Sequence, residues 1–193
     1  MSPRTAEQFE MIRQGRREEI LDAALHVFAE SGYHSASVSQ IAKRACVSKG
    51  LMYNYFESKE EVLTTLITDL FEYTMERMKI YPNEVIDDAR FEEIIEISVQ
   101  IPIEEPQRWK LYMGLAFQKD VTEMIMQEMM GRMGPYVEGL GQYFKKQGHQ
   151  DPMAMMRIFS AVLDGVQMHC LLDPVNFPVE NAKRYLKEQF VRR

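Results

Sequence analysis

The chain has 193 residues, a formal net charge of −6 and 46% hydrophobic residues, enough for one or two globular domains with a real core. No apolar run approaches the roughly 18 residues that a membrane-spanning helix needs, and the N-terminus lacks the apolar core of a signal peptide. We therefore expect a soluble, cytoplasmic protein.

The two cysteines are far apart in the sequence. Neither Cys46 nor Cys170 has a CxxC partner or a nearby cluster of histidines and cysteines. We expect two reduced thiols in place of a disulfide or a metal site. No cofactor is expected.

The N-terminal third predicts an arm followed by a helix. Residues 1–14 show no apolar periodicity, so we expect a partly disordered arm that either contacts DNA or is simply frayed. A helix follows over residues 16–31, with one apolar face and Gly32 as a left-handed C-cap.

Two short helices come next, separated by a tight turn. Ser37 and Gln40 form a capping box for the first helix. Ser48 can cap the second, after a turn that contains only Cys46 and Val47. Helices joined by so short a turn cross steeply, which is the helix-turn-helix arrangement.

The second of these helices has an unusual surface. Leu51 and Phe56 are expected to face the core, which leaves two tyrosines, a methionine, an asparagine and a lysine outside. A soluble helix rarely exposes this combination without a reason. Hydroxyl, amide and ammonium groups at a helix N-terminus suit phosphates and base edges.

The segment V-S-K-G-L-M-Y-N-Y-F-E-S-K-E-E-V, residues 47–62, resembles the DNA-binding signature of the TetR family of bacterial transcriptional regulators. The resemblance covers roughly residues 16–66. One departure is Cys46, where the family usually has glycine. A left-handed backbone at this position would cost about 1 kcal/mol.

The resemblance implies two sets of DNA contacts. The base-edge contacts fall on Ser39, Lys49, Gly50 and Tyr53. The phosphate contacts fall on Ser37, Leu51 (through its backbone), Asn54, Tyr55 and Lys59. The alternative for both tyrosines is that they only pack on the first helix.

The net negative charge does not exclude DNA binding, because it is unevenly divided. Residues 1–60 carry eight basic and eight acidic side chains, so the remainder holds the whole excess. Arg13, Arg16 and Arg17 before the first helix could form a basic edge together with the lysines of the motif.

The rest of the chain predicts further helices that are bounded by prolines. A capping box of Ser58 and Glu61 begins a long helix that we expect to act as a lever between two domains. Pro135 should kink or break a later helix near Arg132. The expected helices cover residues 58–81, 87–101 (stopped at Pro102), 106–117, 120–148, 152–172 and 178–192.

The predicted fold is all-α, with about nine helices. Residues 1–60 would form an N-terminal arm and a three-helix helix-turn-helix DNA-binding domain. Residues 61–193 would form a helical ligand-binding and dimerisation domain. The helix over 151–172 is apolar almost all round and must be covered on both sides. We therefore expect a homodimer through helices 151–172 and 178–192, reading a near-palindromic operator.

An effector pocket is expected between residues 87 and 173. The 15 methionines of the chain favour an adaptable apolar pocket, although most of its candidates could equally be core residues. Asp164 and His169 could be polar anchors, but an ionised Asp164 better suits a surface or dimer contact. The candidate lining residues are Trp109, Tyr112, Met113, Phe117, Met124, Met129, Met133, Tyr136, Phe144, Phe159 and Met168.

The resemblance implies a transcriptional repressor that a small, largely apolar ligand releases from DNA, with ligand-dependent activation as an alternative. A second alternative is a DNA-binding regulator without a small-molecule effector. An all-α enzyme using Asp164, His169 and Cys170 is disfavoured, because Asp164 and His169 are five residues apart and do not reliably share a helix face.

Overall fold

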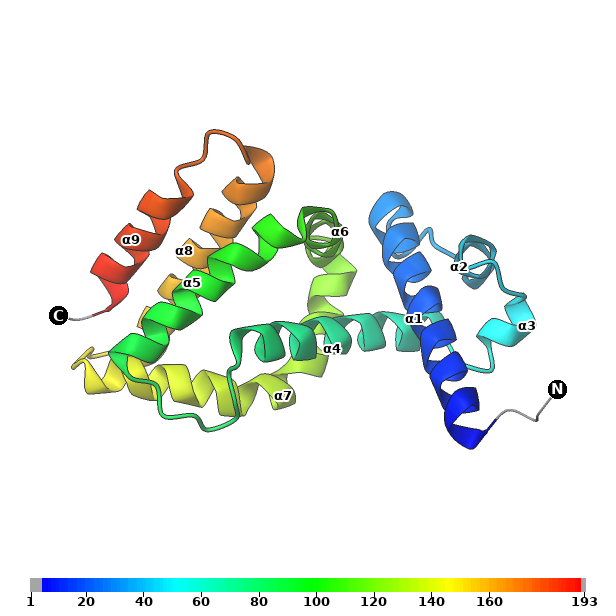
Figure 1. Ribbon diagram of the computed structural model, residues 1–193, viewed down its shortest axis with the longest axis horizontal. Helices are drawn as coiled ribbons and strands as arrows, with labels where there is room; N and C mark the ends of the chain where they lie inside the picture. The colour runs from blue at the N-terminus through cyan, green and yellow to red at the C-terminus, as the bar shows by residue number, and fades with distance from the viewer. Residues whose placement is uncertain (1–4, 192–193) are drawn as a thin grey trace. The chain divides into compact units, whose positions relative to one another are not determined.

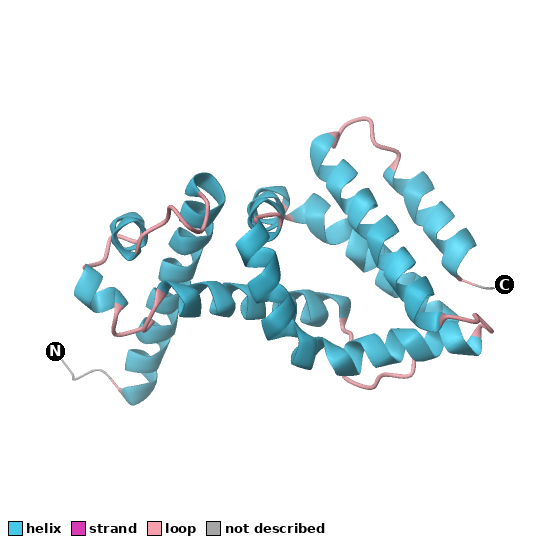
Figure 2. Cartoon of the chain, turned by 180° about the vertical axis from the view of Figure 1, so that it is seen from behind, coloured by secondary structure: helices cyan, strands magenta, loops and turns pink. Residues whose placement is uncertain are grey.

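The computed structural model describes residues 5–191, except for the side chains of residues 120 and 125–130. Every regular element in the described part is an α-helix, as Figures 1 and 2 show. This confirms the predicted all-α fold. None of these helices is both long and apolar enough to cross a membrane. The nine helices are α1 (Ala6–Ser31), α2 (Val38–Arg44), α3 (Lys49–Met52), α4 (Lys59–Met78), α5 (Asp88–Glu104), α6 (Pro106–Ala116), α7 (Lys119–Lys146), α8 (Pro152–Leu172) and α9 (Val179–Phe190).

The chain divides into two compact units. The N-terminal unit comprises Met1–Leu70 with Leu111–Glu128, and the C-terminal unit comprises Phe71–Lys110 with Met129–Arg193. Helices α4, α6 and α7 therefore contribute residues to both units. The functional division at residue 60 stays a prediction.

The N-terminal unit is built around α1. Its inward face buries Ile20, Ala24 and Phe28 completely, and α2 and α3 lie on the same side of it (Figure 1). Ile41 of α2 and Met52 of α3 complete this apolar contact. Burial of such side chains contributes about 1.5–3 kcal/mol each and holds the two short helices, which would be unstable alone.

The expected N-terminal arm is wrong from Ala6 onward, because α1 begins there. Thr5 accepts a hydrogen bond from the Gln8 N–H, and the Gln8 side chain accepts one from the Thr5 N–H, so the two form a capping box. The capping box precedes the segment with apolar periodicity from which the helix was predicted. The helix therefore starts ten residues earlier than predicted. At the other end Gly32 has φ +80° and ψ 147°, which is a positive φ but not a left-handed helical conformation.

Pro102 was expected to stop one helix and Pro135 to kink or break another, and both helices continue through these prolines. The kink at Pro135 stays a prediction. Pro102 lies within α5 and Pro135 within α7. Pro102 has no N–H for the carbonyl of Ser98 four residues earlier, and the buried Gln167 side chain donates to that carbonyl instead (2.8 Å). Helix α5 therefore continues because α8 supplies the missing donor.

Helix α4 ends three residues earlier than expected. Lys79 adopts a left-handed φ of +53°, and the N–H of Ile80 donates to the carbonyl of Met75 (3.0 Å). This is the hydrogen-bond pattern of a helix end with a left-handed terminator, so the helix stops before Pro82.

The C-terminal unit has its core between α5, α8 and α9, which pack on one another. Five aromatic rings form the centre of this core, with neighbouring ring centroids 4.3–6.5 Å apart. The rings belong to Phe91, Tyr143, Phe144, Phe159 and Phe190. Ion pairs from Glu96 of α5 to Lys183 (3.1 Å) and Lys187 (2.5 Å) of α9 border it.

Candidate nucleic-acid interface

The start of each short helix is capped as the sequence predicts. The Ser37 hydroxyl accepts from the Gln40 N–H (3.3 Å), and the Gln40 side chain accepts from the Ser37 N–H (2.8 Å). The Ser48 hydroxyl accepts from the Leu51 N–H (3.0 Å). These caps satisfy N–H groups that have no partner within their own helix.

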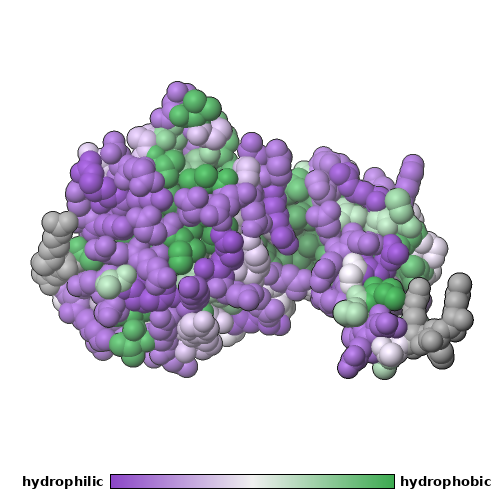
Figure 3. Space-filling model, viewed as in Figure 1, coloured by the Kyte–Doolittle hydropathy of each residue, from purple (hydrophilic) through white to green (hydrophobic). Residues whose placement is uncertain are grey.

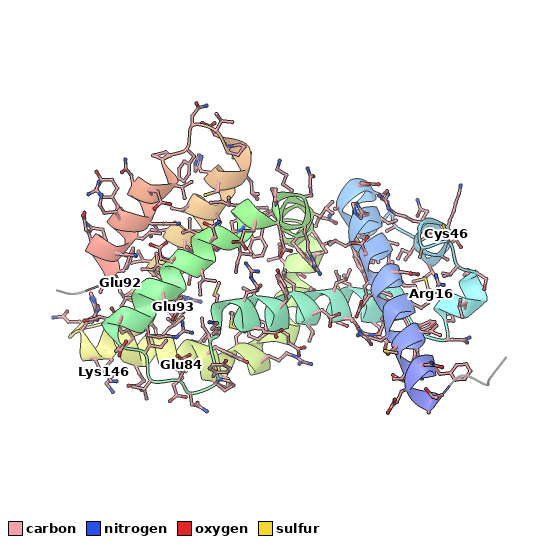
Figure 4. All side chains as sticks on the ribbon, viewed as in Figure 1. Arg16, Cys46, Glu84, Glu92, Glu93 and Lys146 are labelled. Carbon is pink, nitrogen blue, oxygen red and sulfur yellow. The ribbon has the colours of Figure 1, made fainter. Side chains whose placement is uncertain are left out.

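The turn between the helices depends on a left-handed residue. Cys46, labelled in Figure 4, has φ +55°, which confirms the predicted backbone. The N–H of the next residue, Val47, donates to the carbonyl of Ala42 (2.9 Å), as at the end of α4. The chain thereby reverses sharply enough for α3 to begin at Lys49.

Helix α3 is shorter than predicted, and its inward residue is a different one. It covers Lys49–Met52. Met52 is 1% exposed, whereas Leu51 is 36% exposed, so the expectation that Leu51 faces the core is wrong and Phe56 (3% exposed) is correctly placed. Leu51 and Met52 are adjacent, and a one-residue change in the helix phase exchanges them.

The predicted base-reading residues are each exposed. Ser39, Lys49, Gly50 and Tyr53 are all exposed, and Lys49 and Tyr53, one turn apart, place an ammonium 6.0 Å from a ring centroid. A Cβ atom added at Gly50 would contact no described atom. The arrangement offers an ammonium, hydroxyls and an open backbone position to an incoming ligand.

The predicted phosphate contacts differ in how accessible they are. Ser37, Leu51 and Asn54 are exposed and Tyr55 is half-buried. The alternative in which both tyrosines only pack on α1 therefore does not suit Tyr53, which is 48% exposed. The contacts themselves stay predictions.

Lys59 is held by the protein itself. Its ammonium donates to the carbonyls of Tyr33 (2.8 Å), Ala36 (3.0 Å) and His34 (3.4 Å), and it lies 4.4 Å from the Tyr33 ring centroid. An ammonium has three N–H donors, and all three face carbonyls of the α1–α2 connection. The geometry assigns Lys59 a role in joining α4 to this connection.

Tyr33 is the centre of this junction. It is 5% exposed and its hydroxyl donates to Glu60 (3.1 Å). Burial and the neighbouring Glu60 carboxylate raise the pKa of Tyr33 to about 12. The role of Glu60 was not predicted, because no local pattern links residues 27 positions apart.

Most arginines of the N-terminal unit are paired. Arg17 contacts Asp69 (3.5 Å) and Arg44 contacts Glu30 (2.8 Å), while Arg16, labelled in Figure 4, pairs with Glu19. The three arginines expected before the first helix lie within α1. Within the described ranges, Arg13, Lys43 and Lys49 make no ion pair and are the cations available to a ligand.

The predicted effector-pocket residues do not share one environment. Phe144 and Phe159 are closed into the aromatic core, whereas Phe117 is 72% exposed. Tyr136 packs on Phe71 (5.2 Å between centroids). Tyr112 is buried, Met113 and Met124 are half-buried, Met133 and Met168 are exposed, and the Met129 side chain lies outside the described residues.

Trp109 has one notable feature. The residue is half-buried, and its indole Nε1 is inaccessible and has no hydrogen-bond partner among the described residues.

Four surface cavities of about 190–300 Å³ are lined by none of the eleven predicted residues. The pocket therefore stays a prediction.

Capped helices, a left-handed turn and an exposed Lys-Gly-Tyr surface define a helix-turn-helix DNA-binding protein. Comparison with known proteins narrows the class of DNA-binding protein. A family model described as bacterial regulatory proteins, tetR family, matches residues 20–66. Residues 20–66, about a quarter of the chain, therefore match the DNA-binding part of the tetR family of bacterial regulatory proteins.

Three known proteins illustrate the similarity. The fatty acid metabolism regulator protein of Bacillus subtilis (strain 168) is 46% identical over 61 residues, which are 32% of this chain and only 31% of that protein. The HTH-type transcriptional regulator PksA of the same organism is 26% identical over 181 residues, 90% of this chain and 87% of the other. The crystal structure of a TetR family transcription regulator from Marinobacter aquaeolei VT8 has a TM-score of 0.68 and 16% identity, covering 95% of this chain and 100% of that one.

Proposed function

We propose that this regulator represses transcription in the cytoplasm by binding a near-palindromic operator as a homodimer, and that a small, largely apolar effector releases it. The observation that carries the proposal is the exposed surface of Ser39, Lys49, Gly50 and Tyr53 on capped helices. In this function Lys49 donates to a base edge, and Gly50 allows the backbone to approach the groove.

The outer face of α8 supports the homodimer. Ile158, Val162 and Leu172 are 53%, 42% and 69% exposed, although the opposite face of the helix lies in the core. Figure 3 shows apolar side chains on the surface around the α8–α9 connection, at the top of the view. A second copy of α8 and α9 would bury this face, as isologous interfaces do.

The position of Asp164 fits such an interface. It lies on the exposed side of α8, yet partial desolvation raises the pKa of its carboxyl. Its exposure is the observation that favours the dimer-contact role over an effector anchor. Residues 61–193 would then carry both dimerisation and effector binding.

A second candidate is a regulator without a small-molecule effector. The observation that favours it is the closed packing of Phe144 and Phe159, which are 0% and 3% exposed. A thermal-shift screen separates the two candidates. A ligand at 100 times its dissociation constant stabilises the folded state by about 2.7 kcal/mol, so an apolar effector should raise the melting temperature and weaken operator binding together.

The central test is a gel-shift titration against the DNA upstream of the protein's own gene. We expect salt-sensitive binding that Tyr53→Ala weakens by about 5- to 150-fold, because a base-edge contact contributes about 1–3 kcal/mol. The matched control is Tyr81→Ala, since Tyr81 is also exposed (63%) and lies outside the motif. Equal affinity of Tyr53→Ala and wild type would remove Tyr53 from the interface.

A further inference from the structure

The short connection between α6 and α7 is anchored in the N-terminal unit. Leu115 before it and Val121 after it are 2% and 0% exposed. The Thr122 hydroxyl donates at the connection, with the carbonyls of Ala116 (2.7 Å) and Gln118 (3.1 Å) as acceptors. This connection belongs to the same compact unit as the helix-turn-helix motif, although it is some 60 residues later in the chain.

Gln118 joins this connection to the end of α1 through both ends of its amide. Its Oε1 accepts from the N–H of Tyr33 (2.6 Å), and its Nε2 donates to the carbonyl of Phe28 (3.1 Å). A glutamine amide offers an acceptor and donors together. A carboxylate could satisfy only the first contact, and an apolar side chain neither.

The contacts continue from Tyr33 to the DNA-binding motif. The Tyr33 carbonyl accepts from Lys59 at the start of α4, and Lys59 also donates to the carbonyl of Ala36. Ala36 directly precedes Ser37, the N-cap of α2. A continuous series of hydrogen bonds thus connects the α6–α7 connection with the first residues of α4 and α2.

We propose that Gln118 is a positioning residue for DNA recognition: it couples the α6–α7 connection to the helix-turn-helix motif through Tyr33 and Lys59. Operator binding and the conformation of residues 115–122 are then linked. Since linkage is reciprocal, a change at this connection alters operator affinity. This rests on the proposed function, in which an effector would produce such a change.

The test uses the isosteric substitution Gln118→Met in the full-length chain. The matched control is Gln107→Met, because Gln107 is exposed on α6 and its side chain makes no hydrogen bond within the described part of the chain. Loss of two hydrogen bonds should weaken operator binding by at least about fivefold, while Gln107→Met binds as wild type does. Gln118→Glu, which keeps the acceptor for Tyr33, should fall between them.

Hydrogen exchange with and without operator DNA distinguishes coupling from general destabilisation. In wild type, DNA should slow exchange in peptides covering residues 37–55 and also residues 115–122. In Gln118→Met, saturating DNA should still slow exchange in residues 37–55 but should no longer slow exchange in residues 115–122. Faster exchange of the Tyr33 N–H in the DNA-free variant would show, independently of any affinity measurement, that its hydrogen bond to residue 118 is lost.

The outcomes are separable. If wild-type protein binds DNA, and Gln118→Met keeps both its affinity and the DNA-dependent protection of residues 115–122, the role of Gln118 is refuted and the proposed function stands. If wild-type protein binds no upstream fragment at low salt, the proposed function fails, and the DNA-recognition role of Gln118 fails with it.

Discussion

The ammonium of Lys59 and the ammonium of Lys49 belong to one DNA-binding unit but have opposite environments. Lys59 donates to three carbonyls, whereas Lys49 is exposed, with its ammonium 6.0 Å from the centroid of the Tyr53 ring. Hydrogen bonds to charged groups contribute about 1.5–3 kcal/mol each before solvent screening. Substitution of Lys59 should therefore change the stability of the fold, and substitution of Lys49 should change operator binding.

We predict that Lys59→Met lowers the free energy of unfolding by about 2 kcal/mol, measured by urea denaturation. Lys49→Met should leave it unchanged within about 0.5 kcal/mol and reduce the salt dependence of operator binding by about one unit of slope. If Lys59→Met were fully stable and reduced the salt slope instead, Lys59 would be a phosphate contact after all.

Cys46 carries backbone strain that glycine would relieve. Its φ of +55° costs a non-glycine residue about 1–2 kcal/mol, and part of this is offset by the greater chain entropy of unfolded glycine. Cys46→Gly should therefore raise the free energy of unfolding by about 0.5–1 kcal/mol. In thermal denaturation the control Ser39→Gly, in the exposed first turn of α2, should lower the melting temperature. A lower melting temperature for both variants would contradict the strain at Cys46.

At the scale of elements, α5 and α8 are joined by the hydrogen bond from Gln167 to the Ser98 carbonyl (2.8 Å). Both residues are buried, so an unpaired carbonyl there costs about 1–3 kcal/mol. We predict that Gln167→Met lowers the free energy of unfolding by this amount. In a Pro102→Ala background the loss should be much smaller, because the new backbone N–H can bond to Ser98. Additive effects in this double-mutant cycle would show that Pro102 is unrelated to Gln167.

Neighbouring elements also decide where helices end. A proline within a helix predicts a break when only the chain itself is considered, because the ring removes a donor. Pro102 is tolerated since a donor from α8 replaces the missing one. By contrast, the ends of α2 and α4 depend on left-handed residues within the turn, Cys46 and Lys79, and of these the sequence predicted only the first.

At the scale of the whole molecule, the proposed homodimer would use the outer face of α8 to bring two reading helices together. Ile158→Glu would place a charge in the apolar face, and desolvating an unpaired carboxylate is costly. We predict a monomer in analytical ultracentrifugation and an operator affinity at least about tenfold lower by mass action. Val85→Glu, at an exposed apolar position outside α8 and α9, should remain dimeric. A monomeric wild type would refute the dimer.

The sequence alone determined the helical fold, the caps at Ser37 and Ser48, the turn at Cys46 and the exposed Lys-Gly-Tyr surface. These features depend on residues within a few positions of one another, so short-range hydrogen bonding and helical period are sufficient to predict them. Only the tertiary structure decided that Met52 and not Leu51 enters the core, that Lys59 binds the α1–α2 connection, and that Gln118 contacts Tyr33. The hydrogen bonds of Lys59 with the α1–α2 connection and of Gln118 with Tyr33 join residues from 23 to 85 positions apart, and their geometry exists only once α1, α4 and the α6–α7 connection have packed together.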